Sequence, residues 1–375
     1  MTIQNLPDPI LIANQASLER MLKALNQEAT LAVDTEANSL YAYQERVCLI
    51  QISTLDADYL IDPLAIEDFT SLIDIFKNPK IEKIFHASEY DVIMLAKDLG
   101  FQFANIFDTM LAARILGREK MGLNTLLEEF FGIQVDKRYQ KADWGKRPLP
   151  MGMLRYAQID THYLIDLRNI LSAELLQAER WPLAQEDFAL ACRPLTLNGH
   201  KLPPCWRGRD IQNLSPRNAA VYQKLCEYRD GIAKKRDQPL FKVLSSKDLL
   251  TLAEACPQTQ NELRSLRGLS QRSIQQHATG LLKAIQAGLE AEPFLPPHPK
   301  RKTSAYLNRI QALKQWRTTA AKKMGVNSSV ILPRHILHTV ANKNPHTPEE
   351  LAQILKEVPW RLEHFGMEIL EVLNN

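Results

Sequence analysis

The stretch "AVDTEANSL" (residues 32–40) places two carboxylates, Asp34 and Glu36, at the end of an apolar segment whose composition predicts a β-strand. Successive side chains of a strand point to opposite faces, so residues i and i+2 project from the same face. Two carboxylates this close repel each other unless a divalent cation with oxygen ligands lies between them. A single pair of this kind is more often a solvated edge of a sheet, so a metal site needs further acidic partners.

Short β-rich segments alternate with helical patterns through the first half of the chain. Strands are predicted at 30–36, 47–53, 59–63 and 80–86, with a further short strand just before Asp108. Helices are predicted near 67–77, 88–100, 122–132 and 151–172, and another begins after Asp108. Gly100 is the expected C-cap of the 88–100 helix, and Asp108 is an expected N-cap. The alternation predicts an α/β domain with a mixed sheet and flanking helices.

The second half of the chain is predicted to be helical and duplicated. From about residue 207 the pattern is helical periodicity interrupted by Pro and Gly, and a proline-rich linker follows at 291–302. When the sequence is shifted by 88 positions, residues 223–263 match residues 311–351 with 14 identities and no gap. We therefore expect three domains and a linker, with these bounds: an α/β domain at 1–195, a first helical domain at 207–290, the linker at 291–302, and a second helical domain at 303–375.

The net charge of +3 conceals an asymmetry between the two halves. Lys and Arg against Asp and Glu give −8 for residues 1–180 and +11 for residues 181–375. A basic half joined to an acidic half suggests that the basic half holds a polyanion while cations sit in the acidic half. Two unrelated solvated surfaces would give the same numbers, so charge alone does not decide.

The five cysteines are scattered and never spaced as CxxC, which predicts neither a disulfide framework nor a zinc site. The N-terminus lacks a basic region followed by a cleavage site, and no apolar run reaches 18 residues. We expect a cytoplasmic protein that does not cross or bind a membrane.

Three further residues lie where helices can bring them to the carboxylate pair. Asp91 is early in the helix that follows the 80–86 strand, and Tyr156 and Asp160 are one turn apart on the 151–172 helix. Each has a commoner explanation when taken alone. Asp91 would then be a helix-start carboxylate, and Tyr156 would be a buried tyrosine bonded to its neighbour.

The order of these motifs is more specific than any one of them. DxE, then a helical Asp in "HASEYD", then YxxxD in "YAQID" resembles the three exonuclease motifs of the DEDD superfamily, in its Tyr-containing branch, and ribonuclease D in particular. The similarity covers about residues 10–175, and "VCLIQIS", "FDTMLAARILG" and "DWGKRPL" resemble the family's intervening segments. The resemblance implies an RNase H-like exonuclease fold.

The resemblance also implies roles for the residues. Two divalent ions, Mg²⁺ or Mn²⁺, would be held by Asp34, Glu36, Asp91 and Asp160. Asp34 would bridge the ions, Glu36 and Asp160 would bind the ion on the nucleophile side, and Asp91 would act on the second ion. Tyr156 would orient the attacking water, since its ordinary pKa near 10 makes it a poor base at neutral pH.

Several residues near these motifs are candidate substrate contacts. Leu40 matches the position of an apolar wedge against the terminal bases, and Lys137, Trp144 and Arg147 belong to a basic loop that could grip phosphates. A core leucine and a solvated loop are equally ordinary explanations. Asp108 is expected to cap a helix rather than bind metal, and His86 is expected to be a hydrogen-bonded core histidine.

Both helical copies resemble the HRDC domain, the C-terminal module of helicases and ribonuclease D. The second copy diverges after Leu351, where the "LRGLSQR" turn of the first has no clear counterpart. Lys234, Lys235 and Arg236 in the first copy would supply sequence-independent phosphate contacts to RNA.

These inferences together predict a 3′–5′ exoribonuclease that releases nucleoside 5′-monophosphates. The family resemblance implies single-stranded RNA 3′ ends and tRNA precursors as substrates, 3′ maturation of tRNA and other small structured RNAs as the role, and no obligate protein partner. A 3′–5′ DNA exonuclease and a catalytically inactive RNA-binding protein are the alternatives.

Overall fold

The computed structural model describes residues 6–193, 202–208, 210–297 and 302–374. One six-stranded sheet, in the order β1-β4-β3-β2-β5-β6, forms the centre of the N-terminal domain. Its strands are β1 (Ile10–Ile12), β2 (Thr30–Ala37), β3 (Val47–Ser53), β4 (Asp58–Ile61), β5 (Glu82–Phe85) and β6 (Ile106–Asp108). β2 pairs antiparallel with β3 and parallel with β5, so the predicted mixed sheet is confirmed. The three-residue β1 was not predicted because it is too short to show a period.

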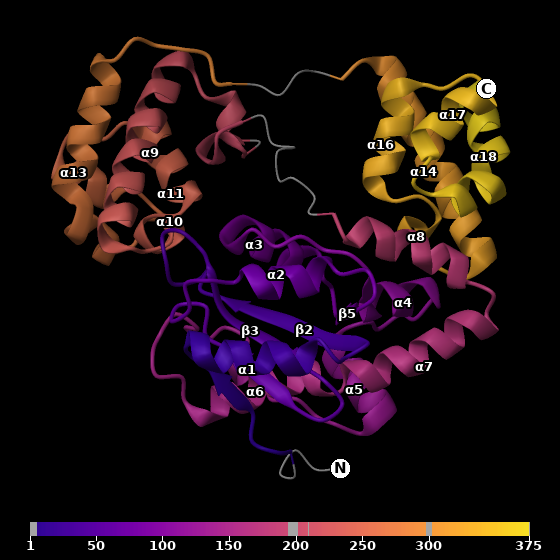
Figure 1. Cartoon of the computed structure of the whole chain (residues 1–375). Coiled ribbons are helices and arrows are strands. Elements are labelled where there is room, and N and C mark those ends of the chain that lie inside the picture. Colours follow the sequence, from indigo (N-terminus) through magenta and orange to yellow (C-terminus); the bar gives the residue numbers. More distant parts are fainter. Residues whose placement is uncertain (1–5, 194–201, 209, 298–301, 375) are drawn as a thin grey trace. The chain divides into compact units, whose positions relative to one another are not determined.

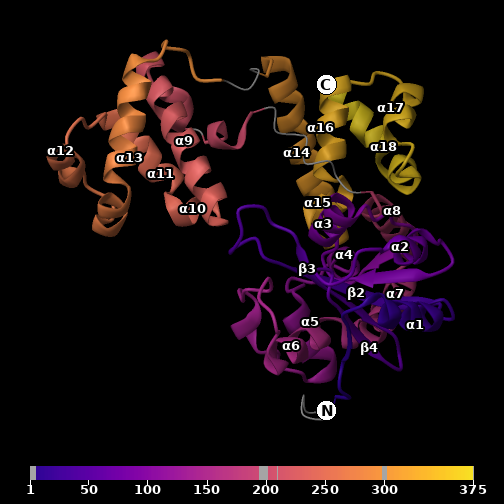
Figure 2. The same cartoon turned by 60° about the vertical axis from the view of Figure 1, so that its left-hand side comes forward.

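Helices surround this sheet (Figures 1 and 2). They are α1 (Gln15–Leu25), α2 (Thr70–Lys77), α3 (Glu89–Leu99), α4 (Thr109–Ile115), α5 (Leu123–Phe131), α6 (Met151–His162), α7 (Leu164–Gln177) and α8 (Trp181–Ala191). Gly100 ends α3 in the left-handed conformation at φ 73°, and Asp108 caps α4 by accepting from the amides of Met110 and Leu111. Both capping predictions are confirmed.

The predicted helix over 151–172 is wrong at one point, because the chain breaks into α6 and α7 at Tyr163. The Tyr163 ring is buried and stacks on Phe131 with centroids 5.6 Å apart. No Gly or Pro marks this break, so the helical periodicity continues across it in the sequence.

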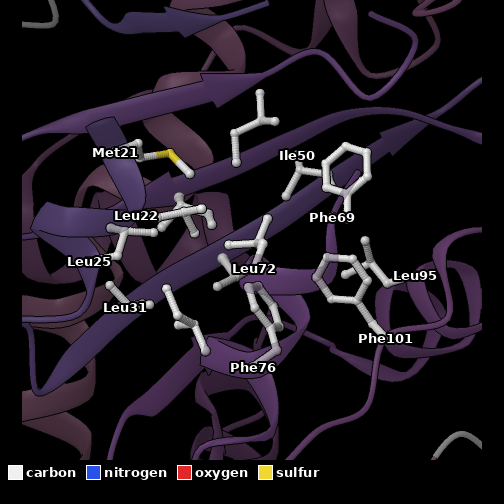
Figure 3. Packing of buried hydrophobic residues seen from close by; sticks show 14 of the residues in the cluster. Met21, Leu22, Leu25, Leu31, Ile50, Phe69, Leu72, Phe76, Leu95 and Phe101 are labelled. Carbon is white, nitrogen blue, oxygen red and sulfur yellow. The ribbon is translucent and has the colours of Figure 1, made fainter. Parts of the chain in front are cut away.

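Two apolar clusters cover the two faces of the sheet. Leu31 and Val33 of β2 belong to the cluster formed with α1, α2 and α3, part of which is drawn in Figure 3. Ala32 belongs instead to the cluster formed with α4, α5, α7 and α8. β2 therefore alternates between two buried faces, as a central strand does.

The C-terminal half contains two copies of one helical arrangement. The first copy has α9 (Pro216–Arg236), α10 (Leu240–Val243), α11 (Ser246–Ala255), α12 (Gln260–Ser265) and α13 (Gln271–Glu290). The second has α14 (Ser304–Met324), α15 (Ser328–Ile331), α16 (Arg334–Lys343), α17 (Pro348–Leu355) and α18 (Pro359–Asn374). Each helix of the second copy begins 88 residues after its counterpart, so the correspondence of the helices continues past Leu351 although the sequence identity fades. No strand follows β6 in the described residues.

One hydrogen bond from an arginine to a backbone carbonyl recurs in both copies. The Nη1 atom of Arg229 donates to the carbonyl oxygen of Leu244 at 3.2 Å, and that of Arg317 donates to the carbonyl oxygen of Leu332 at 2.9 Å. Both arginines and both leucines are among the identities found at the 88-residue shift. The repeat in the sequence is therefore a repeat of tertiary contacts.

The cysteines of the first copy depart from the prediction. Cys205 and Cys226 form a disulfide, although the scattered cysteines predicted none. Their separation of 21 positions matches no recognisable cysteine motif, and the packing of the segment before α9 against that helix brings the two together. None of the described helices is long and apolar enough to span a membrane.

The chain divides into two compact units. One contains the sheet domain with the second helical domain, as residues Met1–Ala37, Val47–Leu195 and Lys302–Asn375. The other contains the first helical domain together with the segment Asn38–Arg46, which connects β2 to β3. The two copies of the helical domain thus belong to different units.

A buried arginine joins the second helical domain to the sheet domain. Arg361 of α18 is fully buried, and its guanidinium donates to Glu186 and Asp187 of α8, both at 2.7 Å, and to the carbonyl oxygen of Val330. Trp360 and Val330 extend the apolar cluster of the sheet domain. At Gly117, which has φ +83°, an added Cβ would lie 2.3 Å from the carbonyl oxygen of Gly325. The second helical domain is therefore packed onto α8 and α4 through a charged and apolar interface.

We predict that Arg361→Ala destabilises the protein by about 3–5 kcal/mol, because it leaves two buried carboxylates without a cation. Chemical denaturation and limited proteolysis of residues 302–374 measure the effect. Arg193→Ala is the matched control, since Arg193 pairs with Glu357 across the same interface but with side chains 64% and 41% exposed, and exposed pairs contribute about 0–1 kcal/mol. Equal losses of stability in the two variants would contradict the role given to Arg361.

Candidate active site

The site begins with the two carboxylates of β2. Leu31 and Val33 face one cluster and Ala32 faces the other, so Asp34 and Glu36 project on the Ala32 side, where α6 packs against β2. Both side chains are partly exposed, whereas Thr35 between them is buried on the opposite face. The predicted same-face placement therefore holds in the fold.

α6 contributes Tyr156 and Asp160 to the same face of the sheet. Asp160 is 7% exposed and Tyr156 is half-buried. The centroid of the Tyr156 ring lies 6.1 Å from that of the Tyr139 ring and 6.2 Å from that of the Trp144 ring. Tyr139 and Trp144 therefore restrict the Tyr156 ring.

Asp91 enters from the first turn of α3 and is 6% exposed. The hydroxyl of Thr35 donates a hydrogen bond to its carboxylate, with 2.5 Å between Oγ1 and Oδ1. Asp108 fixes the turn before α3, because it accepts from the amides of Ala87 and Ser88 and from the Ser88 hydroxyl. Asp91 is thus linked to the strand that carries Asp34 and Glu36.

The pKa values show that the four carboxyls act on one another. Burial raises the pKa of Asp34 well above its ordinary value, and the charges of Asp91, Asp160 and Glu36 raise it further. Burial, followed by the charges of Asp160 and Asp91, raises the pKa of Glu36 to about 9. Burial raises the pKa of Asp160 to about 8 and that of Asp91 to about 7, the latter against the opposing hydrogen bond from Thr35. Within the described residues, the main influences on these four pKa values include no basic side chain.

The same carboxylates also influence the pKa of the Tyr156 hydroxyl. Burial raises its pKa, and the charges of Asp160, Glu36 and Asp34 raise it further. Tyr156 therefore keeps its proton at neutral pH and can donate a hydrogen bond, but it does not act as a base.

The donor set fits hard divalent cations, which prefer carboxylate oxygens. Four interacting carboxyls without a basic partner are an uncompensated negative site, and a divalent cation is the group that would neutralise it. As the side chains stand, the described residues include no group of three or more His, Cys, Asp or Glu already arranged to hold a metal ion. Like charges separate when no cation draws them together, so ligation requires these side chains to turn toward a shared ion.

Asp58 supports α6 and was not identified from the sequence. This buried carboxylate accepts from Ser53 Oγ at 2.6 Å, Gln158 Nε2 at 2.6 Å and His162 Nδ1 at 2.8 Å. Burial raises the pKa of Asp58, but these three hydrogen bonds outweigh it and lower the pKa overall. Gln158 and His162 flank Asp160 on α6, so Asp58 holds that helix against β3 and β4. In the sequence, the polar residues Gln158 and His162 on either side of Asp160 were the feature that could have indicated a buried polar partner for α6.

His86 and Asp108 take the structural roles expected of them. The His86 ring bonds to the Thr109 hydroxyl at 2.9 Å, and Asp108 is a buried capping residue. Neither is needed to explain the acidic face.

Two of the predicted substrate contacts, Trp144 and Arg147, have structural roles. Trp144 is 1% exposed, so its ring is not available to stack on RNA. The Arg147 guanidinium makes two hydrogen bonds to Asp62, both at 2.6 Å, and donates to the carbonyl oxygen of Cys48. Arg147 thus fastens the 140–150 segment to β3 and to the end of β4. Its side chain is 29% exposed, and the contact of Arg147 and of Trp144 with substrate stays a prediction.

The other predicted contacts are exposed. Leu40 is 39% exposed in the turn after β2, and Lys137 lies on the surface of a short 3₁₀ helix, Lys137–Tyr139. Lys234, Lys235 and Arg236 lie exposed in the last turn of α9. Their contact with RNA stays a prediction.

The chain has sequence relatives in both of its halves. Residues 9–176 match the family model for 3′–5′ exonucleases, and residues 218–285 and 307–373 each match that for the HRDC domain. Protein RRP6-like 2 of Arabidopsis thaliana is 31% identical over 73% of this chain and 33% of its own length. Ribonuclease D of Pseudomonas paraeruginosa is 27% identical over 97% of both chains.

A solved structure agrees with these relatives. Escherichia coli RNase D, described as an exoribonuclease involved in structured RNA processing, superposes with a TM-score of 0.69 at 25% identity over 98% of this chain and 99% of its own. The chain spans about a third to a half of the length of the RRP6-like proteins that it matches.

We predict that the metal-free protein loses stability as the pH rises from about 4 to about 9. The folded-state pKa values of Glu36, Asp91 and Asp160 lie above those of the unfolded chain, near 4, so in this window the folded state holds protons that the unfolded chain has released. Thermal unfolding at several pH values with a chelator measures this slope.

Addition of Mn²⁺ should raise the melting temperature more at pH 8 than at pH 6, because binding competes with these protons. At about 100 times the dissociation constant the rise should be about 5 °C or more. Asp160→Asn should flatten the pH dependence and remove most of the metal effect, whereas Asp166→Asn, an exposed carboxyl on α7, should leave both unchanged. A metal effect that Asp160→Asn leaves intact would place the cation elsewhere.

Proposed function

The chain is a member of the ribonuclease D family, with a 3′–5′ exonuclease domain and two HRDC domains, and from this premise we propose that it is a metal-dependent 3′–5′ exoribonuclease. The observation that carries the proposal is that Asp34 and Glu36 of β2, Asp91 of α3 and Asp160 of α6 lie close together, since the charges of the other three raise the pKa of Asp34.

In the proposed site, Asp34 and Glu36 of β2, Asp91 of α3 and Asp160 of α6 hold two divalent ions, Mg²⁺ or Mn²⁺. Bound there, the ions would supply an activated water and charge stabilisation at the leaving oxygen. The charges of all three other carboxylates raise the pKa of Asp34, so Asp34 is close to each of them. This position suits a residue that would be shared by both ions.

Tyr156 orients the nucleophile in this proposal. Its hydroxyl stays protonated beside Asp160, Glu36 and Asp34, so it donates a hydrogen bond to the attacking water or to the scissile phosphate. The rings of Tyr139 and Trp144 limit the positions that this hydroxyl can reach.

The proposed products are nucleoside 5′-monophosphates, and the proposed substrates are the 3′ ends of tRNA precursors and other small structured RNAs. The named activity of the E. coli relative in structured RNA processing supports this substrate class. Two HRDC domains on a chain whose second half carries +11 support a polyanionic substrate longer than a few nucleotides.

Two other functions remain as outcomes of the experiment. A 3′–5′ DNA exonuclease would use the same carboxylates, but the similarity to ribonuclease D over nearly the whole chain favours RNA. An inactive RNA-binding protein would have no need to keep four mutually repelling carboxyls, which lower its stability.

We predict that Asp34→Asn or Asp160→Asn lowers cleavage of 3′ ends by about 10³-fold or more, because each removes a metal ligand without removing a core contact. Tyr156→Phe should cost less, about 10–100-fold, since it removes one hydrogen bond to the reacting groups. Asp166→Asn on the exposed side of α7 is the matched control and should retain full activity.

The measurement follows a 5′-labelled RNA and the DNA of the same sequence side by side, with Mg²⁺, with Mn²⁺ and with a chelator. Stepwise shortening of the RNA from its 3′ end and release of nucleoside 5′-monophosphates are the expected results. Retained activity in Asp34→Asn refutes the site, preferential shortening of DNA supports the DNA exonuclease, and retention of RNA without cleavage supports the inactive binder.

A further inference from the structure

A cavity of about 600 Å³ lies within the unit formed by the first helical domain and segment 38–46. Basic and amide side chains make up most of its lining, contributed by Arg236, Gln238, Lys242, Arg272 and Gln276, with the ring of Tyr41 beside them. The lining thus comes from the end of α9, from α10, from the first turns of α13, and from the segment that follows β2.

Segment 38–46 is fixed to the helical domain by Tyr43. The Tyr43 amide donates to Asp237 Oδ1 at 3.0 Å, and its hydroxyl donates to Asp230 Oδ1 at 2.8 Å. Its side chain also packs against the apolar core of that domain. The wall that this segment contributes is therefore held by specific bonds.

Tyr41 sets the position of Lys242 within the cavity. The Lys242 Nζ atom lies 4.2 Å from the centroid of the Tyr41 ring, which is the geometry of a cation–π contact. Asp237, the acidic residue of the lining, ends α9 in the left-handed conformation at φ 45° and accepts the bond from Tyr43. Three cations against one carboxylate leave the cavity with an excess of two positive charges.

We propose that this cavity binds a nucleotide of the RNA substrate upstream of its 3′ end. Arg236, Lys242 and Arg272 would contact a backbone phosphate, since the guanidinium group matches phosphate geometry and the ammonium group acts as a point charge. Gln238 and Gln276 carry amide groups that can both donate to and accept from the edge of a base. The volume falls within the range of small-molecule sites and suits one nucleotide.

This inference rests on the proposed function, and it names the part of the substrate that the cavity recognises. Tyr41 follows Glu36 by five residues, which can span at most about 18 Å of extended chain. This upper bound corresponds to the length of a few nucleotides, so in our proposal the nucleotide in the cavity is one a few positions upstream of the terminal phosphodiester. Cleavage of very short substrates should not depend on the cavity.

The first experiment measures binding without cleavage. In the full chain carrying Asp34→Asn, Arg272→Glu and Lys242→Glu should each weaken the binding of a labelled single-stranded RNA of about ten nucleotides by about tenfold or more. Lys283→Glu is the matched control, because Lys283 is an exposed cation on α13 outside the cavity, and it should change affinity less than about twofold. Arg272→Ala should reduce the salt slope of log K by about 0.7, the value for one lost phosphate contact to a single strand.

The second experiment uses the active protein and two substrate lengths. With the longer RNA, Arg272→Glu should raise KM about tenfold and leave kcat unchanged, and with a dinucleotide it should change neither. Equal binding by the cavity variants and the Lys283→Glu control overturns the proposal, while cleavage by the parent protein stays intact. Loss of all cleavage in the parent protein instead overturns the proposed function.

Two further arms identify the ligand and the role of Tyr41. Saturable binding of a free nucleoside 5′-monophosphate that Arg272→Glu abolishes, with RNA affinity unchanged, would overturn the RNA assignment in favour of a mononucleotide site. Tyr41→Phe should bind RNA as the parent does and Tyr41→Ala should bind several-fold more weakly, because the ring and not the hydroxyl positions Lys242. Equal affinities of the two Tyr41 variants would overturn that positioning role.

Discussion

The repulsion among four neighbouring carboxyls, two of them buried and two partly exposed, is the constraint on which the structure of the sheet domain depends. Burial raises the pKa values of Asp34, Glu36, Asp91 and Asp160, and neighbouring carboxylates raise those of Asp34 and Glu36 further. In the described part of the chain no basic side chain is among the main influences on these values. These four carboxyls therefore lower the stability of the folded state, and the apolar cores and hydrogen bonds elsewhere in the domain must compensate for that loss. Groups that destabilise the fold but suit the binding of a cation are typical of functional sites, because such sites are selected for their chemistry and not for stability.

Three buried hydrogen-bonding groups hold the elements that carry these carboxyls. Thr35 links β2 to Asp91, Asp108 links β6 to the turn before α3, and Asp58 links β4 to α6 on both sides of Asp160. None of the three needs to touch a metal or a substrate. Each fixes the orientation of an element, which is what a site built on separate strands and helices requires.

The two copies of the helical domain share a fold but make different contacts. Arg229 and Arg317 make corresponding hydrogen bonds in the two copies, and the helices keep their 88-residue offset. The second copy carries Arg361 and packs onto α8, whereas the first carries the basic cavity and takes in segment 38–46. The surfaces of the copies differ where their helical cores agree.

The sequence by itself determined the succession of strands and helices from β2 to α6, the repeat, the two caps at Gly100 and Asp108, and the acidic positions of β2, because periodicity and capping are local properties of the chain. Only the tertiary structure decided that Trp144 is buried, that Arg147 bonds to Asp62, that Cys205 meets Cys226, that Asp58 holds α6, and that the helix over 151–172 breaks at Tyr163. Each of these depends on a partner brought near by packing, some as many as a hundred residues away. No local pattern records which of two polar side chains will face solvent and which will find such a partner.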